Sequence, residues 1–114
     1  TKILILTFND MATIFIGTEL KLNINIAPID SMTMDDYDFE VEVWTSSQKM
    51  MRIAKENTIK VDENNRIILV DTNLLGAGDM KYKVTAYLPD GDFPDRVRTE
   101  IVAMETGIKI IKTL

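Results

Sequence analysis

The two glycines in Gly76-Ala77-Gly78 are the first residues whose type and spacing suggest chemistry. A glycine-rich loop binds phosphate when it follows a strand and opens a helix, because the amino end of a helix attracts the anion. Here the spacing matches neither GxGxxG nor GxxxxGK[ST], and the residues after Gly78 alternate in polarity as they do in a strand. We therefore interpret Leu75, Gly76 and Gly78 as a structural corner between two sheets, where a positive φ angle favours glycine.

Aspartates gather at two further places, and such groups can serve as calcium ligands or as a catalytic carboxylate pair. Asp30, Asp35, Asp36 and Asp38 cluster near one expected crossing between the sheets, and Asp90, Asp92 and Asp95 lie near one turn. Neither group matches the D-x-[DN]-x-[DN]-G loop with its distal glutamate. Because aspartates at turns commonly accept backbone N–H groups, we expect caps here, with a calcium ion as the open alternative.

Two residue types are missing from the chain, which has 114 residues and neither cysteine nor histidine. The lack of cysteine removes disulfides, thiolate nucleophiles and zinc–thiolate sites. The lack of histidine removes the commonest general base and the commonest transition-metal ligand. We therefore predict a protein that is not an enzyme and uses no cofactor.

The net charge of −5 argues against nucleic acid as a partner, because Lys and Arg supply most of the affinity for phosphates. It also disfavours anionic membrane surfaces, and no apolar run approaches the roughly 20 residues of a membrane-spanning helix. The opening TKILILTF is too short for a signal peptide and has no small-residue cleavage site after it. Because Thr1 is not a methionine, the removal of a start residue or of a longer leader stays open, and so does export.

Apolar and polar residues alternate along most of the chain, which predicts strands with one face on a core. The clearest strands cover residues 20–26, 37–43 and 80–88, and Asp62-Glu63-Asn64-Asn65 predicts a hairpin between 59–61 and 67–69. Further strands are expected at 3–8, 13–17, 50–53, 98–104 and 108–112. Eight or nine short strands without a repeat or linker predict one all-β domain over residues 1–114, an immunoglobulin-like antiparallel β-sandwich.

Both ends of the chain carry stretches that are apolar on two faces, Ile3-Leu4-Ile5-Leu6 and Ile108-Lys109-Ile110-Ile111. Such strands would aggregate if they were exposed. Each is therefore expected either inside this domain or paired with a neighbouring subunit. Residues 1–8 are in this sense a candidate assembly strand.

Strand parity places Trp44 and Tyr87 among polar residues, and exposed aromatic side chains are typical of interfaces. For Trp44 a position over the sheet edge, as part of the core, is equally open. Parity points Tyr82 inward, where it could hydrogen-bond across the glycine bend as in the tyrosine corner of sandwiches. The candidate interaction surface consists of Ile3, Ile5, Trp44, Tyr87, Phe93, Ile108 and Ile110.

Several passages together resemble a known family: Asp38-Phe39-Glu40-Val41-Glu42-Val43-Trp44, a short lysine-bearing strand, VDENNRIILVDTNLLGAGDMKYKVTAYLPDGDFPDRVRTE and the ending TGIKI. They resemble small β-sandwich structural proteins of phages and prophages of gut Bacteroides. These proteins are similar in layout to the immunoglobulin-like amino-terminal domain of the phage baseplate upper protein. The resemblance covers roughly residues 36–111, and its motifs are structural, so no catalytic residue is carried over.

The resemblance implies a virion component of the tail or baseplate type, assembled in the bacterial cytoplasm. Its partners would be other protein subunits, either copies of itself in a homo-oligomer or phage tail proteins. The alternative function is an adhesin-like module that binds a surface glycan or peptide through Trp44, Tyr87 or Phe93.

Overall fold

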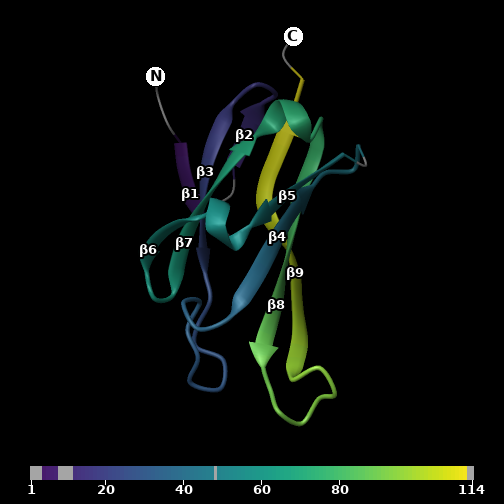
Figure 1. The fold of residues 1–114 in the computed structure, drawn as a ribbon. Helices are drawn as coiled ribbons and strands as arrows, with labels where there is room; N and C mark the ends of the chain where they lie inside the picture. Colours follow the sequence, from purple (N-terminus) through teal and green to yellow (C-terminus); the bar gives the residue numbers. More distant parts are fainter. Residues whose placement is uncertain (1–3, 8–11, 48, 113–114) are drawn as a thin grey trace.

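The structure is a computed structural model that describes residues 4–7, 12–47 and 49–112 (Figure 1). The described residues form nine strands and two short 3-10 helices. In chain order these are β1 (Leu4–Thr7), β2 (Ala12–Phe15), β3 (Glu19–Asn25), β4 (Asp38–Trp44), β5 (Met50–Ala54), η1 (Lys55–Asn57), β6 (Ile59–Asp62), β7 (Asn65–Asp71), η2 (Thr72–Leu74), β8 (Gly78–Pro89) and β9 (Val97–Ile111).

The strands form two sheets that pack face to face, with the orders β1-β3-β7-β6 and β2-β9-β8-β4-β5. If β3 to β9 are given the letters B, C, C′, D, E, F and G, one sheet reads B-E-D and the other G-F-C-C′. This is the strand order of an immunoglobulin-like sandwich. The prediction of an all-β sandwich with eight or nine short strands is therefore confirmed.

Two details differ from the predicted antiparallel pairing. Strand β1 runs parallel to β3, and β2 runs parallel to the last residues of β9, so the two amino-terminal strands lie at edges of different sheets. The predicted strands at 98–104 and 108–112 are one continuous strand, β9. A bulge lets β9 continue, since Asp79 pairs with Lys109 while Lys81 pairs with Glu105, and Gly107 takes a φ of 80°.

The core lies between the sheets and is built from alternate residues of the central strands. In β3 the inward residues Leu20, Leu22 and Ile24 are buried, and their polar neighbours face outward. The opposite layer contributes Phe39 from β4 and Leu88 from β8. The alternation that predicted these strands therefore also separates the core face from the outer face.

The connections follow the turn chemistry of their sequences. In the β6–β7 hairpin, Asp62 Oδ1 accepts hydrogen bonds from the backbone N–H of Asn64 at 2.9 Å and from the Asn65 amide at 2.8 Å. The predicted hairpin and its Asx contacts are thus present. The turn from β8 to β9 spans Asp90 to Arg96, where Asp90 N donates to the Arg96 carbonyl at 2.9 Å.

The glycine pair lies between β7 of the four-stranded sheet and β8 of the five-stranded sheet. Leu75 is fully buried, and its carbonyl accepts hydrogen bonds from the hydroxyl groups of Thr45 and Ser47. Gly76 and Gly78 have φ angles of 76° and 132°, which side-chain-bearing residues rarely adopt. The chain therefore turns here from one sheet to the other and enters a strand, in which Tyr82 is buried.

We predict that Gly78→Ala destabilises the fold, because its Cβ would overlap the side chain of Ser46 and lie 3.2 Å from the Ser46 backbone nitrogen. The positive φ adds strain, and together we expect a loss of about 1–3 kcal/mol in the free energy of unfolding. Urea unfolding measures it. Gly91→Ala is the control, since nothing lies within 4 Å of a Cβ at that position. Equal stability of the two variants would contradict the corner interpretation.

Candidate interaction surface

In the described part of the five-stranded sheet, one side of β9 is uncovered over most of its length. Strand β8 pairs with β9 along its length, whereas β2 covers the other side only from Ile108 to Ile111. In Figure 1, β2 lies beside only the upper, carboxyl-terminal part of β9. Over the described residues, no strand covers positions 97–107 on that side. We call this stretch the β9 edge.

The centre of the β9 edge is apolar on both faces of the sheet. Ile101 is 59% exposed and lies opposite Thr85, while Val102 is 48% exposed and lies opposite the buried Val84. Ala103 is exposed as well. The unpaired N–H and C=O groups of an open strand form a template for another strand, and exposed apolar side chains mark interaction sites. The β9 edge is therefore a candidate interaction surface.

Charged residues flank this apolar centre. Glu100 precedes it and Glu105 follows it, and such residues beside an apolar strand suppress unspecific aggregation. Arg98 is bound to Asp90 at 3.0 Å and to Asp30, which ties the β8–β9 turn to the crossing between β3 and β4. These ion pairs fix the start of β9 beside the turn, whereas its apolar centre is exposed.

The sequence prediction for the carboxyl-terminal residues is wrong. Ile108 and Ile110 were expected on the interaction surface, but each is 1% exposed and packs in the core of this chain. The reason is the pairing of β2 with β9, which places Ile14 opposite Ile110 on the inner face. Ile108 and Ile110 are thus buried inside their own domain, which is the first of the two options given for this stretch.

The amino-terminal candidates are only partly described. Ile3 lies outside the described residues. Ile5 lies in β1, and its backbone pairs with Lys21 of β3 in the same chain. The described part of the predicted assembly strand is therefore paired within the chain. Phe93 is exposed in the β8–β9 turn, far from β1 along the sequence.

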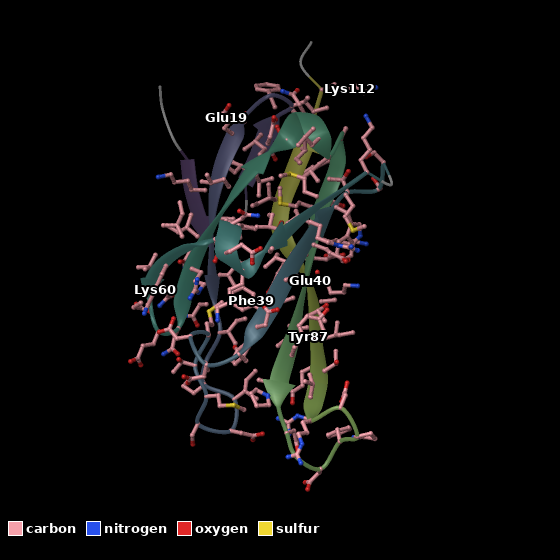
Figure 2. All side chains as sticks on the ribbon, viewed as in Figure 1. Glu19, Phe39, Glu40, Lys60, Tyr87 and Lys112 are labelled. Atoms are coloured by element: carbon pink, nitrogen blue, oxygen red, sulfur yellow. The ribbon has the colours of Figure 1, made fainter. Side chains whose placement is uncertain are left out.

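Trp44 and Tyr87 both lie on the outer face of the five-stranded sheet and are half-buried. Trp44 pairs with Lys81, so it stands six β8 positions away from Tyr87, or about 20 Å at the usual rise per strand residue. Tyr87 donates a hydrogen bond to Glu40 Oε1 at 3.2 Å, and Figure 2 shows the two side chains on adjacent strands. Burial, followed by the Glu40 carboxylate, raises the pKa of Tyr87. The aromatic residues therefore form no continuous shelf.

Between these aromatics, a charged cluster crosses three strands. The Glu42 carboxylate is bound by Arg52 Nη2 at 2.8 Å and by Lys83 Nζ at 3.1 Å. Burial raises the pKa of Glu42, but the hydrogen bonds and charges of Lys83 and Arg52 outweigh it, so the pKa lies below its usual 4.5. This cluster could not be predicted from the sequence, because the three residues become neighbours only when β5, β4 and β8 pair.

The predicted aspartate groups serve as caps and ion-pair partners. Asp35 binds Lys60 at 2.7 Å and Arg66 at 3.0 Å. Asp95 accepts the backbone N–H of Val97, and Asp90 accepts that of Asp92. Within the described ranges, no three acidic side chains are arranged to hold a metal ion.

Ile101, Val102 and Ala103 were not among the predicted surface residues, although a strand was predicted around them. A signal was present, since these three consecutive apolar residues break the alternation just as Ile3-Leu4-Ile5-Leu6 does. What the sequence does not contain is the place of the strand in the sheet. Only the strand order and the short pairing with β2 show that residues 97–107 of β9 lie at an edge of the sheet.

Comparison of the chain with protein-family models and with curated proteins found no match. In the described part of the chain, no helix has the length and apolar character needed to cross a membrane.

We predict that Glu42→Gln lowers the free energy of unfolding at pH 7 by about 1 kcal/mol, because Arg52 and Lys83 lose the charge that pairs them. The folded-state pKa of Glu42 is depressed, so its contribution is complete above about pH 4.5 and is lost as the pH falls through that folded-state value. The stability difference from the unchanged chain should therefore shrink below pH 4.5.

Urea titrations at pH 7 and at decreasing pH measure this difference. Glu56→Gln is the control, because Glu56 is exposed in η1. A difference between Glu42→Gln and the unchanged chain that stays constant down to pH 2 would contradict the assignment.

Proposed function

We propose that this chain is a non-enzymatic structural protein that joins a larger protein assembly through the β9 edge, as a tail- or baseplate-type component of a phage or prophage virion. The observation that supports this function most is the exposure of Ile101 and Val102 on the two faces of one open strand. In this proposal the component assembles in the bacterial cytoplasm.

The physical support comes from the backbone of the β9 edge. An open strand presents N–H and C=O groups in a row, and a strand added from another chain binds them through main-chain hydrogen bonds. Ile101 and Val102 would at the same time be removed from water on both faces of the extended sheet. Affinity and removal of an aggregation hazard thus come from the same contact.

The support for the virion class comes from the sequence. The resemblance to sandwich proteins of Bacteroides phages spans roughly residues 36–111, and it implies function by assembly. The absence of histidine and cysteine fits this class, since such a component needs no catalytic group.

A binding module is the second candidate, and a different surface favours it. Glu42, Trp44, Met50, Lys83 and Ala103 line a shallow hollow on the outer face of the five-stranded sheet. A half-buried tryptophan beside charged groups offers a flat apolar surface together with polar partners, which a glycan or an extended peptide could use.

We predict that the chain is present in several copies in purified virions of a strain that carries its gene, and that Ile101→Lys reduces its incorporation at least tenfold. A lysine on the β9 edge would oppose the apolar partner and leave a charge in the contact. Quantitative mass spectrometry of purified particles measures both. Leu69→Lys is the matched control, because Leu69 is 51% exposed on the outer face of the other sheet.

Absence of the unchanged chain from the particles would overturn the virion function. Equal incorporation of Ile101→Lys and Leu69→Lys would overturn the role of the β9 edge. For the binding module, titration with surface glycans should change the fluorescence of Trp44, the single tryptophan of the chain. An unchanged spectrum across a glycan panel would exclude the glycan form of that function.

A further inference from the structure

We infer that the partner of the β9 edge is the β9 edge of a second copy of this chain, paired antiparallel about a two-fold axis at Ile101. The two five-stranded sheets would then continue into each other. This inference rests on the proposed role of the β9 edge in assembly, and it adds the identity of the partner and the register.

The direction of the backbone groups follows from the β8–β9 turn. Asp90 N donates to the Arg96 carbonyl, so this opposed pair belongs to the hydrogen-bonded type. In an antiparallel ladder the hydrogen-bonded and the non-hydrogen-bonded pairs alternate. Pro89, which has no N–H, lies opposite Val97 in the next pair, where the ladder needs none.

Every second pair from Val97 onward is therefore of the non-hydrogen-bonded type, and these pairs contain Thr99, Ile101 and Ala103 of β9. The N–H and C=O groups of these three residues point away from β8 and toward the open side. These are the groups that a second strand would bind. The regular β8–β9 ladder runs from Val97 to Glu105, and Ile101 is its midpoint. A two-fold axis at Ile101 therefore pairs the whole regular ladder with an equally long strand.

The side chains fit this register. A two-fold axis perpendicular to the sheet places outer residues opposite outer residues, so Ile101 meets Ile101 of the second copy and Thr99 meets Ala103. Glu100 then lies opposite Val102, and no two like charges are directly opposed. An axis at Glu100 would instead oppose two carboxylates, which destabilises a strand pair.

The strand at the opposite end of the same sheet is β5, and it fits the β9 edge less well. It has five residues, so it would pair with only about half of the ladder between Val97 and Glu105. Its contact would also be head-to-tail and would build open chains of subunits rather than a closed pair. The two-fold contact closes after two copies and covers the apolar centre of both.

Disulfide trapping tests the register, and the absence of cysteine from the chain makes it clean. In the two-fold pair the two Cα atoms at position 101 would be about 5.5 Å apart, within disulfide reach. Ile101→Cys should form a covalent dimer under mild oxidation at least tenfold faster than Leu69→Cys, which is about equally exposed but on the other sheet. Equal rates, or a chain that light scattering finds at 13.0 kDa at all concentrations, would overturn the inference.

Ala103→Pro tests the backbone bonds separately from the side chains. The N–H of Ala103 points to the open side and not to β8. A proline at this position should therefore leave the β8–β9 ladder and the melting temperature of the monomer nearly unchanged. The same change should abolish the dimer seen by light scattering. A dimer that persists in Ala103→Pro would overturn the backbone pairing.

These outcomes are distinguishable from failure of the proposed function. Loss of Ile101→Lys from virions, together with a monomeric chain and no trapping at position 101, would keep the assembly role and exclude a second copy as the partner. Trapping at position 101 in a chain that is absent from virions would keep the dimer and exclude the virion role.

Discussion

A sheet that does not close on itself has to end in a strand whose backbone N–H and C=O groups lack a partner on one side. In this sandwich that constraint falls on β9, because β2 runs parallel to it and begins only at Ala12, opposite Ile108, while the preceding strand β1 pairs with β3 in the other sheet. Since β2 is short, most of β9 has no described neighbour beyond β8. The exposure of Ile101 and Val102 and the proposed assembly both follow from this division of the two amino-terminal strands between the sheets.

The alternation of polar and apolar residues predicted most of the fold. It located the strands around residues 20–26, 37–43 and 80–88, because one face of each lies on the core and the other in water. The hairpin at Asp62 and the glycine corner were predictable for local reasons, namely an Asx side chain that binds its own backbone and positive φ angles. These features depend on neighbouring residues, which a single sequence displays.

What could not be predicted depends on residues far apart in the chain. Ile108 and Ile110 were assigned to the surface because their stretch is apolar on both faces, whereas their burial comes from β2, about a hundred residues earlier. The Glu42 cluster joins strands β4, β5 and β8, and the β9 edge exists only because of the strand order. Sheet order and register are set by tertiary packing, and periodicity does not contain them.

Assembly through the β9 edge can be tested by amide hydrogen exchange at single residues of β9, measured in the assembled form and in a dilute monomer. We predict that the amides of Thr99, Ile101 and Ala103, which point to the open side, are protected only in the assembled form. Amides that point toward β8, such as those of Glu100 and Val102, should be protected in both. Fast exchange at Thr99, Ile101 and Ala103 in the assembled form would contradict assembly through the β9 edge.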